Sequence, residues 1–270
     1  MFTLQKFIKA FTFASCLFIL VLNFSYFSIA GTWKDDFNDG NLNGWTHPAD
    51  QVKDKTWSSV WKSENGVLDV TIHVEPHPPD RRDLCSINDF LQLTAFPISS
   101  SKLTVEVTIV GGVQWTSSFG IALGIHPEGG PDIGQFYVFT RDRAFPSYLV
   151  PSGVVNPLGR EDLHRDYPTI PFGQPMKITF ESGRFRLFSQ DTLLLQFVDE
   201  GYPKWAKELL NVQRIEKIEL VGIYAKGFDD VGDFHGVMDD FMISGPNLAV
   251  NARRKLATTW GNMKNESTRF

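Results

Sequence analysis

The chain has 270 residues, of which 42% are hydrophobic and 21% are charged, an ordinary composition for a globular protein with a substantial core. The net charge of -5 supplies no basic surface of the kind that nucleic-acid binding requires, so nucleic acid is excluded as an expected partner. The 23 Phe and 7 Trp residues favour strands, because aromatic side chains suit the half-buried surface of a sheet.

Residues 1–30 have the features of a secretory signal peptide. Lys6 and Lys9 form a basic start, an apolar run follows, and Ser28 and Ala30 place small residues just before a cleavage site. We expect a secreted or periplasmic mature protein with no membrane span. The alternative is an uncleaved leader that tethers the protein to a membrane, because no charge interrupts the long stretch after Lys9.

Cys85 is the only cysteine after this leader, so the mature chain has no internal disulfide. Its stability must come from the core, from strand pairing or from a metal ion. We expect a buried, unreactive thiol, since no nearby pattern supplies a partner base.

The mature chain opens on a stretch dense in acids, amides and glycines, Asp35 to Trp45. Near the other end, Met238 to Gly245 repeats its Asp-Asp-Phe core. Two such clusters at opposite ends of one domain predict that the first and last strands meet and close a sandwich, with Asp36 facing Asp239.

Short segments of alternating apolar and polar residues follow along the chain, each typical of a strand. The predicted strands comprise residues 57–62, 67–74, 90–96, 102–109, 119–125, 135–141, 176–181, 184–189, 193–197, 215–224 and 236–243. Asn65 and Gly66 between the first two runs predict a hairpin turn, because Asn-Gly readily adopts the required backbone conformation.

Three segments do not have this pattern. Residues 144–175 are rich in Pro and Gly and too long for a plain connector, so we predict a functional or covering loop. Residues 203–211 predict one short helix, and the basic tail, residues 247–270, predicts another. Many strands without βαβ units predict an all-β, two-sheet antiparallel β-sandwich, or jelly roll, over residues 31–246.

The order of these pieces resembles the concanavalin A-like lectin/glucanase superfamily, in its laminin-G-like jelly-roll branch of secreted bacterial proteins. The resemblance is carried by Asp35 to Trp45, Trp61 to Leu68, Met176 to Phe197, Leu220 to Tyr224 and Val237 to Phe241. It implies a concanavalin A-like jelly roll and a function connected with carbohydrate.

The resemblance also implies a structural calcium ion. In glucanases of this superfamily the ion joins the opening stretch, the first hairpin and the last strand, and the matching positions are Asp36, Gly66 and Asp239. Calcium takes several oxygen ligands and would offset the repulsion between two acidic loops. The alternative is that these acids accept hydrogen bonds from backbone amides in turns.

A glycan or polysaccharide is the expected partner. Proteins meet the apolar faces and hydroxyl groups of sugars with flat aromatic rings and fork-shaped donors. The candidate residues are Trp57, Trp61, Gln114, Trp115, Tyr137, Arg141, Tyr224 and His235. Arg141 leads, because it ends a strand and begins a charged cluster with Asp142 and Arg143. The alternatives are core packing for the aromatic residues and a surface ion pair for Arg141.

Glycoside hydrolysis needs two carboxylates at a set separation. Glucanases of the superfamily carry a Glu-x-Asp-x-x-Glu strand, whereas residues 102–109 hold a single acid, Glu106. We therefore predict a secreted, non-catalytic carbohydrate-recognition or adhesion module, with no catalytic residue. The alternatives are a glycoside hydrolase, glucanase-like or like the keto-disaccharide hydrolases, which lack the motif, and a structural module that binds another protein through the tail.

Overall fold

The computed structural model describes residues 31–47, 57–74, 86–112, 118–126, 134–150, 153–155, 164–200, 213–228, 233–246 and 248. The chain forms two compact units, Met1–Ala30 and Gly31–Phe270, and all described residues belong to the second. The predicted signal peptide, the predicted helix at 203–211 and the tail beyond Leu248 lie outside the described residues. Within the described ranges, no helix has the length and apolar character that crossing a membrane requires.

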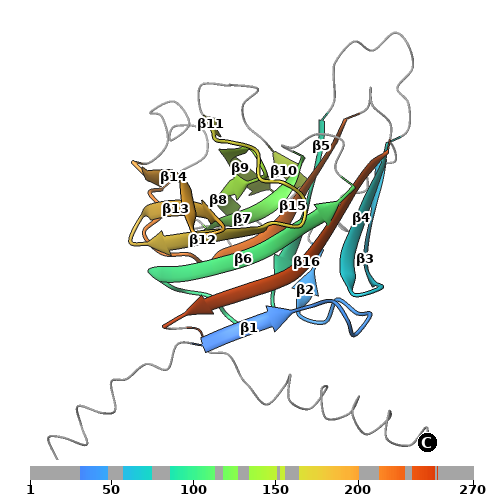
Figure 1. The fold of residues 1–270 in the computed structure, drawn as a ribbon, viewed down its shortest axis with the longest axis horizontal. Helices are drawn as coiled ribbons and strands as arrows, with labels where there is room; N and C mark the ends of the chain where they lie inside the picture. The colour runs from blue at the N-terminus through green and yellow to red at the C-terminus, as the bar shows by residue number, and fades with distance from the viewer. Residues whose placement is uncertain are drawn as a thin grey trace, which may run out of the picture. The chain divides into compact units, whose positions relative to one another are not determined.

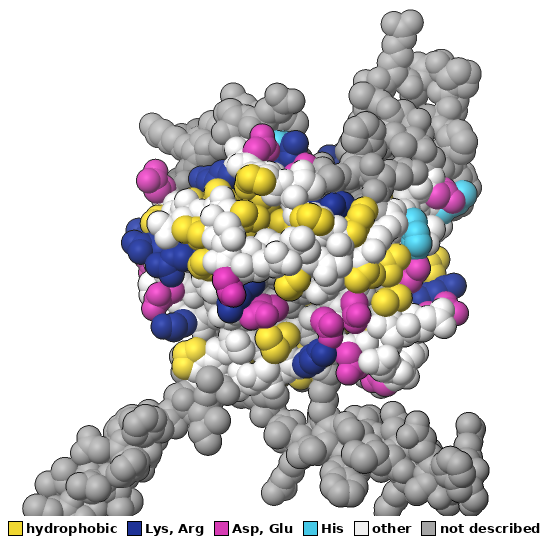
Figure 2. All heavy atoms as spheres, in the orientation of Figure 1, with side chains coloured by type: hydrophobic (Ala, Val, Ile, Leu, Met, Phe, Trp, Pro, Cys, Tyr) yellow, Lys and Arg dark blue, Asp and Glu magenta, His cyan; other side chains and the backbone are white. Residues whose placement is uncertain are grey.

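The first sheet, sheet A, is antiparallel. Its strands are β1 (Gly31–Asp35), β3 (Trp57–Glu64), β4 (Val67–Val74), β6 (Lys102–Gly111), β12 (Pro175–Glu181), β13 (Arg184–Ser189), β14 (Thr192–Val198) and β16 (Phe234–Gly245). Their order is β14-β13-β12-β6-β16-β4-β3, with β1 beside β16. This sheet faces the viewer in Figure 1, and Figure 2 shows that acidic and basic side chains are interspersed over its outer face.

The second sheet, sheet B, is also antiparallel and lies behind sheet A in Figure 1. Its strands are β2 (Trp45–Thr46), β5 (Ser86–Leu93), β7 (Phe119–Ile125), β8 (Gly134–Phe139), β9 (Arg143–Val150), β10 (Gly153–Val155), β11 (Arg165–Asp166) and β15 (Leu220–Phe228). Their order is β10-β9-β8-β7-β15-β5-β2, with β11 beside β9. The two sheets confirm the predicted β-sandwich.

The core lies between the sheets and follows the period-two pattern of the sequence. On β6 the buried side chains are Leu103, Val105, Val107 and Ile109. Ile121 and Leu123 of β7 belong to the same apolar cluster, although they come from the other sheet. Removing this apolar surface from water is the main stabilising contribution to the fold.

Sheet B is also covered on its outer face. A second apolar cluster lies there, made of Phe90, Ala122, Phe136, Val138, Phe145, Leu220 and Tyr224. Burial on both faces explains the continuous apolar run of β7, in which every residue is buried. Gly124 is required at this point, because a Cβ there would lie 1.9 Å from the carbonyl oxygen of Gln135 on β8.

The first and last strands meet, as the sequence predicts. β1 pairs with β16, and Asp35 lies opposite Phe241. Asp35 is buried, and its two carboxylate oxygens accept hydrogen bonds from the backbone amide of Phe37 at 3.1 Å and from Nε1 of Trp45 at 2.9 Å. The acid that anchors this seam is therefore Asp35, whereas its neighbour Asp36 is exposed.

The segment predicted as an irregular loop, 144–175, holds most of β9 together with β10 and β11. Pro146 made the segment look irregular, since proline removes a donor from a strand ladder. In the fold, β10 and β11 pair with the two ends of β9 and leave Pro146 between them. Pro146 therefore interrupts no pairing on that side of β9.

Candidate functional site

The structure places two of the predicted calcium ligands, Asp36 and Asp239, near Lys34. Asp36 Oδ1 accepts a hydrogen bond from the backbone amide of Asn38, and Asp239 Oδ1 accepts one from that of Asp240. Lys34 forms an ion pair with Asp240. The hydrogen bond that Lys34 donates to Asp240, followed by the negative charges of Asp240, Asp36 and Asp239, raises the pKa of Lys34.

Gly66 contributes the turn of the first hairpin. It has a positive φ of 78°, and a Cβ at this position would lie 2.6 Å from the side-chain oxygen of Asn38. Within the described ranges, no three His, Cys, Asp or Glu side chains are grouped so that they could hold a metal ion. The ammonium group of Lys34 already offsets the negative charge at the seam, and calcium binding stays a prediction.

Trp61 lies beside an open groove of about 400 Å³ at the edge of sheet A. The lining residues are Gly40, Asn41, Leu42, Trp61, Lys62, Ser63 and Glu64. The indole is half-buried and packs partly against the core. Its Nε1 donates a hydrogen bond of 2.7 Å to Asp89, and this bond fixes the orientation of the indole.

Asp89 is fully buried and is the centre of a polar cluster between the edges of the two sheets. Its carboxylate oxygens lie 2.7 and 2.9 Å from Nε2 of His47, and one of them accepts the backbone amide of Phe90 at 2.8 Å. Ser59 Oγ lies 3.3 Å from the same Nε2 atom. These contacts join β3 of sheet A to β5 of sheet B.

This Ser-His-Asp combination is not a nucleophile activated by a base. In a catalytic triad the carboxylate binds one imidazole nitrogen and the hydroxyl binds the other. Here Asp89 and Ser59 both meet Nε2 of His47. A hydrogen that Nε2 donates to the carboxylate leaves that nitrogen unable to accept the hydroxyl proton, so the cluster joins the sheets and does not activate Ser59.

Tyr137 and Tyr224 lie in the interior, on opposite faces of sheet B. Tyr137 belongs to the core between the sheets, and its hydroxyl donates a hydrogen bond of 3.1 Å to Asp199. Tyr224 is fully buried in the outer cluster, its ring 5.7 Å from that of Phe145. Neither ring offers a face to a sugar, and burial raises the pKa of Tyr224 far above its ordinary value.

Of the remaining predicted sugar contacts, the structure describes only the side chain of His235. His235 is exposed on the outer face of sheet A, where its Nε2 lies 2.7 Å from Asp69. Trp57 begins β3, and its side chain lies outside the described part of the structure. Gln114 and Trp115 also lie outside the described residues.

A turn and a crossing segment form the charged region around Arg141. The segment 164–172, which we call the strap, crosses the turn at 140–143. Its Tyr167 amide donates to the carbonyl oxygen of Asp142, and its Ile170 amide donates to that of Arg141, at 2.9 and 2.8 Å. The Tyr167 hydroxyl lies 2.6 Å from the carbonyl oxygen of Thr140, and burial raises the pKa of this phenol.

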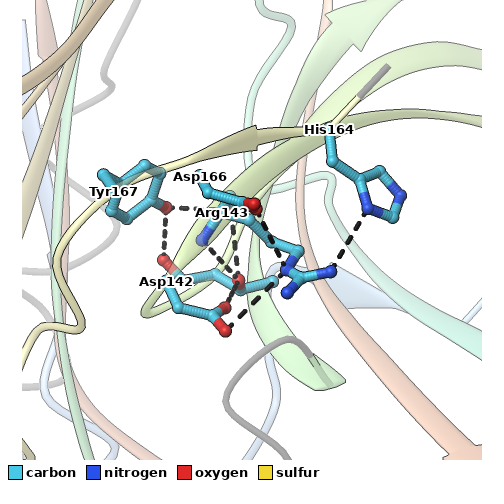
Figure 3. Close-up of polar contacts among 6 residues, drawn as sticks. Asp142, Arg143, His164, Asp166 and Tyr167 are labelled. Carbon is cyan, nitrogen blue, oxygen red and sulfur yellow. Dashed lines mark hydrogen bonds and ion pairs between the residues drawn. The ribbon is translucent and has the colours of Figure 1, made fainter. Parts of the chain in front are cut away.

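Figure 3 shows how the charges of this region pair. Arg143 Nη1 lies 3.2 Å from Nδ1 of His164 on the strap, and its Nε lies 3.5 Å from Asp166 and 3.8 Å from Asp142. Asp142 also accepts a hydrogen bond of 2.9 Å from the Thr140 hydroxyl. The carboxylate next to Arg141 in sequence is therefore held by Thr140 and Arg143.

Arg141 is 8% exposed, and its Nε donates a hydrogen bond of 2.6 Å to the carbonyl oxygen of Ile170. Its guanidinium carbon lies 3.6 Å from the centre of the Phe172 ring. Phe172 is 43% exposed, and no other Phe, Tyr or Trp whose side chain the structure describes is classed as exposed. One face of the ring covers the guanidinium, so the exposed surface belongs to its other face and its edge.

Sequence reasoning identified Arg141 but missed Phe172 and Asp89. Phe172 stands between Pro171 and Gly173, and an aromatic residue in such a turn cannot reach a strand face, which is the signal that could have found it. Asp89 had no comparable signal, because its partners Trp61 and His47 are distant in sequence.

No protein-family model matches the chain, and no curated protein matches it. Among solved structures it is similar to a cellulose-induced protein, Cip1, with 14% identity over 78% of this chain and 96% of that one, at a TM-score of 0.43. It is similar to the carbohydrate-binding module CBM66 from Bacillus subtilis, with 14% identity over 74% and 93% and a TM-score of 0.36. It is also similar to SCLam, a non-specific endo-β-1,3(4)-glucanase from family GH16, with 10% identity over 81% and 92% and a TM-score of 0.43.

At identities of 10 to 14% and TM-scores below 0.5, these similarities do not identify a ligand or an activity. The ligand and the activity have to be inferred from the side chains of this chain.

Proposed function

We propose that this protein is a secreted, non-catalytic carbohydrate-recognition or adhesion module of the jelly-roll type, and that its ligand is a glycan or polysaccharide. The observation that supports the proposal is the contact between Arg141 and Phe172, which we call the Arg-Phe site. It combines an exposed aromatic ring with a guanidinium held 3.6 Å beneath it.

The chemistry of this pair suits a sugar. The C–H face of a pyranose ring can stack on the exposed face of Phe172, and sugar hydroxyls can accept hydrogen bonds from the guanidinium. Arg141 is already held by Ile170 and by the ring, so binding orders few further side-chain bonds. A site fixed before binding loses less conformational entropy when the ligand arrives.

The surroundings of Asp89 support the non-catalytic part of the proposal. A general acid in a glycosidase must reach the glycosidic oxygen and work with a second carboxylate. Asp89 is fully buried, and its two oxygens are taken by Trp61, His47 and the amide of Phe90. A glycoside hydrolase is the alternative, and release of reducing ends in the same binding experiments would establish it.

The test is binding to a panel of soluble polysaccharides, measured by affinity electrophoresis and calorimetry. We expect Phe172→Ala to weaken binding about 5-fold, because stacking on one ring is worth about 1 kcal/mol. The matched control is Leu193→Ala, which removes an apolar side chain of similar exposure, 49%, from β14. Loss of binding in Glu64→Ala would move the site to the groove beside Trp61, and no binding across the panel would overturn the proposal.

A protein partner bound through the tail is the third reading. Under our proposal, deleting residues 249–270 should leave polysaccharide binding unchanged, because Arg141 and Phe172 do not belong to the tail. A pull-down partner that is lost with the tail, together with a blank polysaccharide panel, would favour a structural module.

We also propose that the protein is exported and cleaved after Ala30. Cleavage there would leave β1, which begins at Gly31, at the amino end of the mature chain. The mass of the protein recovered from the culture medium or periplasm should match a chain that starts at Gly31. Recovery of the full-length chain in the membrane fraction would instead support an uncleaved leader.

A further inference from the structure

We propose that the glycan bound at the Arg-Phe site is acidic, and that Arg141 binds a carboxylate or sulfate group of the saccharide. This inference rests on the proposed function and names the class of its ligand.

The charge of Arg141 is buried without a partner anion. The side chain is 8% exposed, and within the described part of the chain no carboxylate lies at ion-pair distance from it. Burial lowers the pKa of Arg141, which reports that the surroundings disfavour its charge, and the nearby charge of Asp142 opposes this only in part. A buried cation of this kind is stabilised when a ligand brings an anion to it.

Two other described arginines, Arg186 and Arg143, have carboxylate partners. Arg186 on β13 donates a hydrogen bond of 2.9 Å to Gln196 and lies 3.9 Å from Glu181. Arg143 lies 3.5 Å from Asp166 and 3.8 Å from Asp142. The Asp142 carboxylate contacts Thr140 and Arg143, and it forms no ion pair with Arg141.

The contacts that hold Arg141 also define how an anion would approach. Nε is occupied by the carbonyl oxygen of Ile170, and one guanidinium face is covered by Phe172. The two terminal nitrogens have no hydrogen-bond acceptor among the described residues, and both point along the plane of the guanidinium. Two parallel N–H donors of this kind match the two oxygens of a carboxylate or sulfate.

The neighbouring ring explains why the anion should belong to a saccharide. A free inorganic anion would use only the guanidinium and would leave Phe172 exposed to solvent. A uronic acid or a sulfated sugar places an apolar ring face and an anionic group side by side, so it can use both Phe172 and Arg141 at once.

The experiment compares acidic polysaccharides with neutral forms of the same backbone. Polygalacturonate is measured against its fully methyl-esterified form, and a sulfated galactan against its desulfated form, by calorimetry with the full mature chain. We expect the acidic member of at least one pair to bind at least 10-fold more tightly. The preference should shrink as salt is raised, because screening weakens charge pairing.

Two variants assign the preference to the site. Arg141→Gln should reduce the acidic preference to less than twofold, while Phe172→Ala should weaken binding of both members of a pair. Arg186→Gln is the matched control and should change neither. Thermal unfolding of each variant checks that it is folded, and if Arg141→Gln does not fold, Arg141→Lys, which keeps the charge but loses the fork, replaces it.

Each outcome separates the two proposals. Equal affinity for acidic and neutral forms would overturn the acidic preference and leave the glycan-binding proposal standing. An acidic preference that survives Arg141→Gln would show that the acidic group binds at a place other than Arg141. No binding to any member, acidic or neutral, would overturn both.

Discussion

At the scale of single residues, Asp89 and Asp240 illustrate two very different carboxylate environments. Asp89 is fully buried, and its donors come from both sheets, Trp61 on β3 and His47 next to β2. Lys34 and Asp240 form an ion pair in which both side chains are about half exposed, at 51% and 52%. Burial makes the first set of contacts important for stability, whereas solvent screens the second.

We expect Asp89→Ala to lower the free energy of unfolding by about 3 kcal/mol, because it leaves the half-buried Trp61 indole and the buried Phe90 amide without acceptors. Urea unfolding followed by tryptophan fluorescence measures the loss. Asp233→Ala is the control, since it removes a half-exposed partner of His73 and should cost less than about 0.5 kcal/mol. A loss as small as that of the control would contradict a joining role for Asp89.

Lys34→Met should cost about 0.5 kcal/mol or less near neutral pH. The hydrogen bond that Lys34 donates to Asp240 raises the pKa of Lys34 in the folded state, so the contribution is complete below the unfolded pKa of about 10.4 and is lost as the pH rises through the folded value. The difference between wild type and variant should therefore shrink as the pH is raised above the unfolded pKa. A difference that grows with pH would contradict this sign.

Calcium at Asp36, Gly66 and Asp239 is tested by chelation. An ion shared by these residues would stabilise the folded state, so removing it would lower Tm. If elemental analysis finds no calcium and a strong chelator leaves Tm unchanged, Lys34 is the cation that offsets these acids.

At the scale of elements, the strands were predictable where polar and apolar residues alternate, and less so elsewhere. β6 and β12 alternate cleanly and were predicted within one or two residues. β9 was missed because it contains Pro146, whose tolerance depends on the gap between β10 and β11. The strap could not be foreseen at all, since its hydrogen bonds join it to a turn more than twenty residues away.

The strap supports a prediction about Tyr167. Its hydroxyl hydrogen-bonds the carbonyl oxygens of the turn, so Tyr167→Phe should cost about 1 kcal/mol at pH 7. Burial raises the pKa of Tyr167 in the folded state, so its contribution is complete below the unfolded pKa of about 10 and is lost as the pH rises above that value. Urea unfolding at pH 7 and pH 10.5 should show the cost of the substitution shrinking, and an equal cost at both would contradict the assignment.

At the scale of the whole molecule, the two ends of the domain hold each other. β1 is the first described strand and pairs with β16, the last. Trp33 of β1 makes edge contacts with Trp45, Phe96 and Phe241, which come from three other parts of the chain. Closing the sandwich therefore depends on a strand that lies immediately after the predicted cleavage site.

We expect Trp33→Ala to lower the free energy of unfolding by about 3–5 kcal/mol, because it leaves a large cavity at this seam. The measurement is urea unfolding of the mature chain. Leu193→Ala, at an exposed position on β14, should change stability by less than about 0.5 kcal/mol. A small effect of Trp33→Ala would show that β1 contributes little to the closed sandwich.

The sequence by itself determined the two-sheet β-sandwich, because alternation with period two depends only on neighbouring residues. The two acidic clusters near its ends predicted that the first and last strands meet. It also singled out Arg141. Only the tertiary structure decided which aromatic residues are accessible, since sheet B is buried on both faces and takes Tyr137 and Tyr224 into the interior. The exposed ring at Arg141 is instead Phe172, brought there by hydrogen bonds between the strap and a distant turn.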